Sequence, residues 1–150
     1  MIECLRTDSD NPDFRQLVRV LDADLNIRDG ADHSFYSQFN KIDSIRYAVV
    51  AYENGIPAGC GAIKDYSVDT MEVKRMFVPV DLRGKGIATR VLSELEQWAR
   101  DLHMKRCVLE TGKRQPEAIS LYMKCGYRII PNFGQYQNVE NSICFEKNLS

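Results

Sequence analysis

The sequence predicts a single α+β domain, built as a mixed sheet of about six to seven strands flanked by about four helices. Three observations predict it. The chain has 150 residues, 44% hydrophobic and 27% charged, which suits one globular domain. Its apolar residues change from a strand-like alternation to a helical period near residue 84. After this change, short strands alternate with helices, as in a sheet with some parallel pairing. We therefore expect one domain over residues 1–150.

The first half of the chain predicts mostly strands. Residues 2–6 read as a short strand, and Asn11-Pro12 starts a helix over residues 12–25, with its apolar residues at helical spacing. A second short helix is expected around Phe35, Tyr36 and Phe39. Three β-branched and aromatic runs follow, joined by tight turns: residues 45–52, 56–66 and 71–78. These short connections predict an antiparallel meander.

The second half alternates helices and strands. A helix over residues 84–102 presents a long apolar face. Cys107-Val108-Leu109 is wholly apolar, which is typical of a strand buried on both faces. Gln115-Pro116 starts a helix over residues 115–124 that Gly126 ends. The last strands are predicted at residues 127–130 and 143–146.

Charge and cysteine content exclude several classes of protein. Lys and Arg number 20 against 21 Asp and Glu, so a general nucleic-acid binder is not expected. No apolar run approaches the ~18 residues of a membrane helix, and the N-terminus lacks the layout of a signal peptide. The five cysteines are scattered without a CxxC pair, so we expect small buried hydrophobes in a reducing cytosol and no metal. The protein is expected to be cytoplasmic, with no membrane partner.

Residues 78–88 join an apolar strand to the longest predicted helix. Gly84 and Gly86 would let a ligand approach the backbone, while Arg83 and Lys85 add positive charge. A helix N-terminus also exposes unpaired N–H groups and the positive end of its dipole. Together these features indicate a pyrophosphate cradle, with a merely tight strand-to-helix turn as the alternative. The Walker spacing is absent, and Thr89 replaces the third glycine of a GxGxxG motif.

The run Arg83-Gly84-Lys85-Gly86-Ile87-Ala88 resembles the Arg/Gln-x-x-Gly-x-Gly/Ala signature of the GNAT superfamily of N-acetyltransferases. Residues 115–127, QPEAISLYMKCGY, resemble that family's second landmark, an Asn-x-x-Ala-x-x-Leu-Tyr helix that leads into Gly-Phe/Tyr. Gln115 stands where the family usually has Asn. The order of predicted elements also agrees, so the resemblance covers essentially the whole chain and implies the acyl-CoA N-acyltransferase fold.

The resemblance implies acetyl-CoA as the acetyl donor and co-substrate. The pyrophosphate would be held by backbone N–H groups of Arg83, Gly84, Lys85, Gly86, Ile87 and Ala88. The pantetheine arm would pair like an added strand with Met76, Phe77 and Val78, and a backbone N–H near Phe77 or Val78 would meet the oxyanion. Gln115 and Tyr122 would complete the cofactor contacts. The strand itself loses its alternation near Arg75–Phe77, which a β-bulge or a strand covered on both faces would explain.

Acetyl transfer needs a base and an acid. An alkyl amine with a pKa of ~10.4 is protonated at pH 7, and freeing its lone pair costs about 4.6 kcal/mol. Glu72 lies on the strand before the phosphate segment, where many family members have a catalytic glutamate; a carboxylate merely paired with Lys74 or Lys64 is the alternative. Tyr122 takes the place of the family's helix tyrosine and is the expected proton donor to the departing thiolate.

The sequence gives less information about the site of the amine acceptor. In such folds the pocket is walled by the first helices and by the loop before the last strand, here residues 22–39 and 131–141. The first carries several aspartates that suit a cationic amine or are simply solvated, and His33 as an alternative base. The second offers Asn132, Phe133, Gln135, Tyr136 and Asn138.

The resemblance thus implies an N-acetyltransferase acting on a primary amine of a small molecule or peptide, by direct attack. A homodimer is compatible with this hypothesis. One alternative is a non-catalytic acyl-CoA-binding or sensing module, which the Gln115 departure favours. Another is a generic nucleotide-binding protein.

Overall fold

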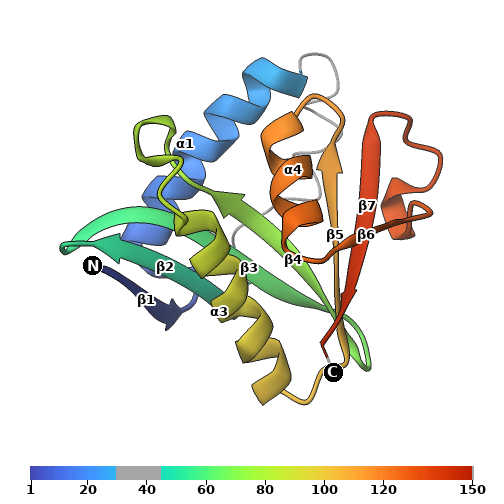
Figure 1. Cartoon of the computed structure of the whole chain (residues 1–150), viewed down its shortest axis with the longest axis horizontal. Helices are drawn as coiled ribbons and strands as arrows, with labels where there is room; N and C mark the ends of the chain where they lie inside the picture. Colours follow the sequence, from blue (N-terminus) through green and yellow to red (C-terminus); the bar gives the residue numbers. More distant parts are fainter. Residues whose placement is uncertain (30–44, 150) are drawn as a thin grey trace.

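The computed structural model describes residues 1–29 and 45–149. Its strands form one mixed seven-stranded sheet in the order β1-β2-β3-β4-β5-β7-β6 (Figure 1). Along the chain the elements are β1 (Ile2–Thr7), α1 (Pro12–Asp29), β2 (Tyr47–Glu53), β3 (Ile56–Ser67), β4 (Thr70–Phe77), the 3-10 turn η2 (Val80–Leu82), α3 (Ile87–Asp101), β5 (Arg106–Gly112), α4 (Pro116–Lys124), β6 (Arg128–Ile130), the 3-10 turn η3 (Gly134–Tyr136) and β7 (Ser142–Asn148). This architecture confirms the predicted α+β class. The short helix expected around Phe35 lies outside the described residues.

The strand pairing follows the predicted connections. Strands β1 to β4 pair antiparallel in sequence order, which confirms the meander. Strand β5 returns parallel to β4 after α3, because a helical crossover brings the chain back to the same end of the sheet. Strand β7 then pairs antiparallel with both β5 and β6. The predicted mixed character of the sheet is confirmed.

Helices cover both faces of the sheet. The side chains of α3 and α4 join one apolar core with β-strand residues, whereas those of α1 form a second core on the opposite face (Figure 1). Close approach of α3 depends on Gly61 of β3, where an added Cβ would lie 2.6 Å from Met76 Sδ and 2.8 Å from Leu95 Cδ1. The apolar face predicted for residues 84–102 therefore packs against the sheet.

Several boundaries differ from the predicted ones. Helix α1 continues to Asp29, past the predicted end at residue 25. Helix α3 begins at Ile87 instead of residue 84, because Gly84 and Gly86 have positive φ and cannot continue a right-handed helix. Strand β5 is longer than its apolar centre, and Cys107, Val108 and Leu109 are buried as predicted.

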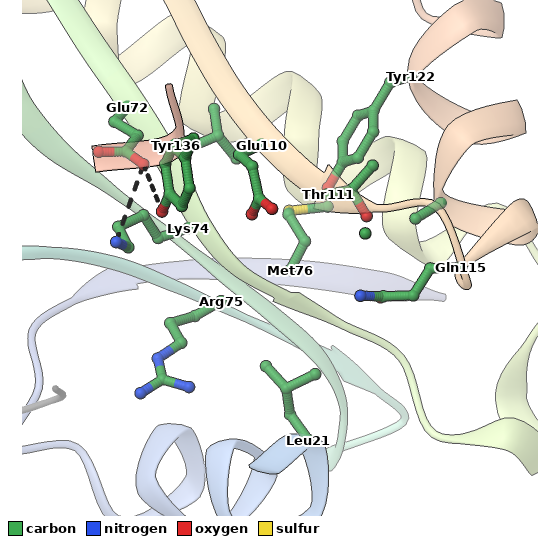
Figure 2. Close-up of a pocket in the computed structure, with 13 residues that line it drawn as sticks. Leu21, Glu72, Lys74, Arg75, Met76, Glu110, Thr111, Gln115, Tyr122 and Tyr136 are labelled. Atoms are coloured by element: carbon green, nitrogen blue, oxygen red, sulfur yellow. Dashed lines mark hydrogen bonds and ion pairs between the residues drawn. The ribbon is translucent and has the colours of Figure 1, made fainter. Parts of the chain in front are cut away.

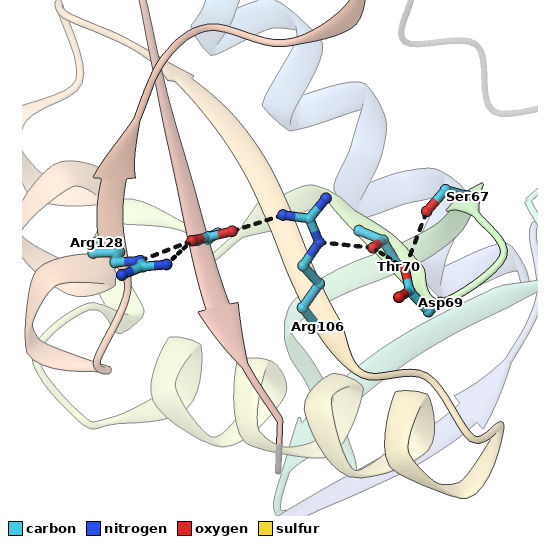
Figure 3. Close-up of polar contacts among 6 residues, drawn as sticks. Ser67, Asp69, Thr70, Arg106 and Arg128 are labelled. Atoms are coloured by element: carbon cyan, nitrogen blue, oxygen red, sulfur yellow. Dashed lines mark hydrogen bonds and ion pairs between the residues drawn. The ribbon is translucent and has the colours of Figure 1, made fainter.

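A polar network ties the last strands to β5 (Figure 3). The buried Glu146 carboxylate of β7 accepts from Arg106 Nη1 at 2.7 Å and from Arg128 Nε at 2.7 Å. Arg106 Nε also donates to Thr70 Oγ1 at 2.8 Å, and that hydroxyl donates to Asp69 Oδ1 at 2.8 Å. The hydrogen bonds from Arg128 and then Arg106 lower the pKa of Glu146, against the opposing effect of burial. The network links β6, β7, β5 and the β3–β4 turn.

Candidate active site

The site lies where β4 and β5 separate. Their parallel pairing covers only Thr70–Val73 of β4 and Arg106–Leu109 of β5. Strand β4 nevertheless continues to Phe77, and β5 to Gly112. Figure 1 shows the two strands diverging toward their carboxyl ends. The opening between them exposes strand edges that are not paired with each other, which is a place where a ligand can add to a sheet.

A β-bulge at Arg75 shapes β4 beside this opening. Between two successive register pairs, β3 advances from Cys60 to Ala62 while β4 takes one residue more. Arg75 has a left-handed φ of 61°, which is uncommon outside glycine. Its Nη1 lies 2.6 Å from Asp22 Oδ1 of α1, and Cys60 Sγ donates to its carbonyl at 3.4 Å. The predicted irregularity near Arg75–Phe77 is confirmed, and it turns Met76 toward the α3 face.

The predicted phosphate segment has the backbone that its glycines allow. The φ angles of Gly84 and Gly86 are +85° and +81°. A Cβ added to either would meet no atom within 4 Å, so open space lies beside both. Gly86 caps α3 without a side-chain hydrogen bond, and no acidic residue stands in the first turn. Such a helix start offers its N–H groups to an anion.

The two basic residues of this segment are placed differently. Arg83 lines the groove beside the glycines, and its Nε donates to the Val78 carbonyl at 2.9 Å. Lys85 is not among the groove residues; its Nζ lies 3.1 Å from Glu53 Oε1 of β2. Lys124, at the end of α4, lines the groove and adds a cation that the sequence analysis missed.

The groove itself measures about 400 Å³ and runs between the end of β4, the start of α3, and α4. Helix α4 begins after Gln115, whose side chain makes no capping hydrogen bond. Most of the expected cofactor contacts line the groove: Met76, Phe77, Val78, Arg83, Gly84, Gly86, Ile87, Ala88, Gln115 and Tyr122. The structure thus brings together residues from three separate elements along one continuous space.

A smaller cavity of about 100 Å³ lies in the opening between β4 and β5 (Figure 2). Its polar wall is formed by Glu72, Lys74, Glu110, Thr111 and Tyr136. The residues shared with the groove are Leu21, Met76, Gln115, Ala118 and Tyr122. Because these residues line both spaces, two reactants can enter separately and meet there.

Glu72 faces the smaller cavity from β4. It is 6% exposed; its Oε2 lies 3.8 Å from Lys74 Nζ and accepts from Tyr136 Oη at 3.4 Å. Burial raises the pKa of Glu72, although the Lys74 charge and the Tyr136 hydroxyl oppose that rise. A carboxylate with a raised pKa is a better proton acceptor near neutral pH. Glu72 therefore lines the cavity, as the catalytic interpretation needs, and it also pairs with Lys74, as the alternative interpretation expected.

Tyr122 lies where the two spaces meet, as Figure 2 shows. Its ring packs 5.8 Å from that of Tyr127 and 5.9 Å from that of Phe145. Burial raises the pKa of Tyr122 well above its usual value, so the phenol keeps its proton at neutral pH. It can donate this proton to an atom held in either space.

Glu110 and Thr111 were not among the predicted site residues, and Lys74 was expected only as a partner for Glu72. Glu110 had a signal: it is the first charged residue after the apolar run Cys107-Val108-Leu109, at the end of a buried strand. Tyr136, expected in the acceptor wall, does line the smaller cavity. Of the first expected wall, Asp22 binds Arg75 and Asp24 lines the groove, while His33 lies outside the described residues.

Comparison with known proteins agrees with this geometry. The model of the Acetyltransferase (GNAT) family matches residues 12–127 of the chain. The chain belongs to the GNAT acetyltransferase family. It is 40% identical over 105 residues to an IAA acetyltransferase of Azospirillum brasilense, covering 67% of each chain. It is 29% identical over 132 residues to the uncharacterized N-acetyltransferase YjgM of Escherichia coli (strain K12), covering 81% of this chain and 78% of that protein.

Solved structures share the GNAT fold along the whole chain. A Klebsiella pneumoniae protein provisionally described as an acyl-CoA N-acyltransferase superposes with a TM-score of 0.84 at 26% identity, covering 100% of this chain and 99% of that one. The PaiA N-acetyltransferase of Thermoplasma acidophilum, solved in complex with coenzyme A, superposes with a TM-score of 0.73 at 17% identity, covering 99% of each chain. The predicted family and its fold are confirmed.

Three further features bear on the other expectations. All five cysteines are free; Cys60, Cys107 and Cys144 are buried, while Cys4 and Cys125 are partly exposed. Within residues 1–29 and 45–149, no cluster of three or more His, Cys, Asp or Glu side chains is arranged to hold a metal ion. None of the helices in the described part of the chain has the length and apolar character needed to cross a membrane.

Proposed function

We propose that this GNAT protein is an acetyl-CoA-dependent N-acetyltransferase that acetylates a primary amine of a small molecule or peptide. The observation that carries the proposal is the meeting of two spaces at Met76 and Tyr122. A long groove for a donor and a small polar cavity for an acceptor converge on one buried phenol. This is the geometry that a direct transfer between two bound molecules requires.

The groove suits the pyrophosphate and pantetheine of acetyl-CoA. Open space beside Gly84 and Gly86 admits phosphate oxygens, and the uncapped start of α3 supplies N–H groups to them. Arg83 and Lys124 line the same groove and add positive charge. Met76 and Phe77 at the end of β4, and Val78 just after it, lie beyond the last pair of β4 with β5. Their backbone edge would bind the pantetheine amides as an added strand does.

Acetyl-CoA supplies an activated thioester, and the residues of this chain would move the protons. Glu72 would take a proton from the acceptor ammonium, directly or through water, so that the amine lone pair can attack. A backbone N–H near Phe77 or Val78 would stabilise the negative charge that develops on the carbonyl oxygen. Tyr122 would donate its proton to the sulfur as the C–S bond breaks, and its raised pKa supports that role. The second proton that the attacking nitrogen must lose to become an amide would restore the phenol, directly or through water.

Release of free thiol from acetyl-CoA with a broad panel of primary amines tests the function. Wild-type protein is expected to turn over at least one class of amine, and mass spectrometry should find the acetylated product. Glu72→Gln should lower kcat by about a hundredfold, because it removes the base but keeps the volume of the side chain. Glu3→Gln, an exposed change on the edge strand β1, is the matched control.

Calorimetry separates the alternatives. Tight binding of acetyl-CoA without turnover of any amine would replace this proposal with the non-catalytic binding module. Equal binding of ADP and acetyl-CoA would indicate a generic nucleotide site. No binding at millimolar acetyl-CoA would refute the proposal outright.

A further inference from the structure

Glu110 has a position in the active site that Glu72 does not share. Leu109 is the last residue of β5 that pairs with β4, and Glu110 follows it directly. Glu110 therefore lies where the two strands begin to separate. In Figure 2 its carboxylate lies between Tyr136 on one side and Met76 and Thr111 on the other. Glu72 lies beyond Tyr136, at the far end of the cavity in the same view. Glu110 is thus the carboxylate nearer to the junction with the groove.

Electrostatic coupling agrees with this placement. Burial is the largest cause that raises the pKa of Tyr122, and the charge of Glu110 is the next. Burial also raises the pKa of Tyr136, followed there by the charges of Glu72 and then Glu110. The Glu110 charge therefore acts at both ends of the smaller cavity, including the phenol beside the groove.

Charged side chains of both signs line the cavity. Glu72 and Glu110 line it together with Lys74 and Arg75. Arg75 is in turn bound by Asp22 at 2.6 Å. The charge of Lys64 also acts on Glu72 and on Lys74, so acidic and basic side chains around the cavity are balanced in number. An ammonium group beside Glu110 would be attracted by its carboxylate, whereas an anionic acceptor would be repelled by it.

Ser142 holds the Glu110 carboxylate in this place. Its Oγ donates to Glu110 Oε2 at 2.6 Å across the β5–β7 pair. A hydrogen bond to one carboxylate oxygen restricts the side-chain rotamers and leaves the group able to accept further bonds. Ser142 is accordingly a positioning residue for Glu110.

We propose that Glu110 is the acceptor-binding carboxylate of this enzyme, which receives the ammonium group of a cationic primary amine beside the junction of the two spaces. This assignment rests on the proposed function, and it gives the two acidic residues different roles. Glu110 selects and seats the cation, whereas Glu72 serves proton removal. The acceptor class that follows is a compact amine that arrives positively charged, and neither an aniline nor a carboxylate.

Amine binding to the CoA-loaded protein tests the assignment without requiring turnover. The probes are n-butylamine and phenethylamine, with n-butanol as the uncharged comparison, and the signals are the NMR shifts of the Thr111 and Gly112 amides. Glu110→Gln should weaken amine binding about tenfold to about a hundredfold, the range of a charge-assisted hydrogen bond. Ser142→Ala should weaken it by a few-fold, and Glu3→Gln on the edge strand β1 should leave it unchanged.

The kinetic readout is the split between KM and kcat. Glu110→Gln should raise KM for the amine while KM for acetyl-CoA stays constant, and Glu72→Gln should mainly lower kcat. Equal amine affinity in wild type and Glu110→Gln would overturn the assignment, as would absence of amine binding by the wild type. A loss of the same size in Glu3→Gln would overturn it too, since it would reflect surface charge alone. Amine binding without thiol release would instead refute the proposed function.

Discussion

Replacement of Gly86 by alanine tests whether the glycine segment holds the pyrophosphate. The φ of Gly86 is +81°, and an added Cβ would meet no protein atom within 4 Å. The cost to the fold is therefore backbone strain without a clash, about 1–2 kcal/mol for an L-residue in the left-handed region. A domain of this size loses roughly 2–4 °C of Tm per kcal/mol, so Tm should fall by about 2–8 °C.

Binding should suffer more than stability. The methyl group would project into the space that the proposal gives to phosphate oxygens, beside the uncapped start of α3. Loss of one or two charge-assisted hydrogen bonds costs about 2–4 kcal/mol, which weakens Kd for acetyl-CoA roughly 30- to 700-fold. Isothermal titration calorimetry measures this, and thermal denaturation measures the stability of the same sample.

Gly55 provides the matched control. It lies in the turn between β2 and β3 with a φ of +82°, and an added Cβ there also meets nothing within 4 Å. It is not a groove residue. Gly55→Ala should lose the same stability as Gly86→Ala and keep its affinity for acetyl-CoA. If the two variants bind acetyl-CoA equally well, the pyrophosphate is not held at Gly86 and the reasoning fails.

Three other perturbations have definite expected outcomes. Tyr122→Phe should lower kcat in the thiol-release assay at least tenfold without abolishing acetyl-CoA binding; unchanged kcat would remove Tyr122 as the acid. The pKa of Glu146 is lowered in the folded state, so the charged carboxylate stabilises the fold at pH values above its ordinary pKa of 4.5. This stabilisation is lost as the pH falls through the lower pKa of the folded state. Glu146→Gln should therefore flatten the fall in unfolding free energy between about pH 5 and pH 3 in urea titrations, and an unaltered slope would contradict this account. Gly61→Ala should cost about 1–3 kcal/mol in the same titrations, because its Cβ would lie 2.6 Å from Met76 Sδ; a neutral effect would mean that α3 shifts freely.

The sequence alone was sufficient for features that depend on neighbouring residues. Tight turns predicted the meander, and the change of apolar period predicted the helix that crosses to a parallel strand. The open backbone at Gly84 and Gly86 was also predictable, because positive φ is a local property of glycine. Element ends were less accurate, since the start of α3 depends on the conformation of those same glycines.

The composition of the candidate active site was decided by the tertiary structure. Glu72, Glu110 and Tyr122 come from β4, β5 and α4, and only strand register and the early end of β4–β5 pairing bring them around one cavity. Likewise Lys85, which was predicted among the phosphate contacts, forms an ion pair with Glu53 of β2. Short stretches of sequence largely determine the local backbone conformation. Which side chains line the same cavity depends on how distant elements pack, and no local sequence pattern specifies this packing.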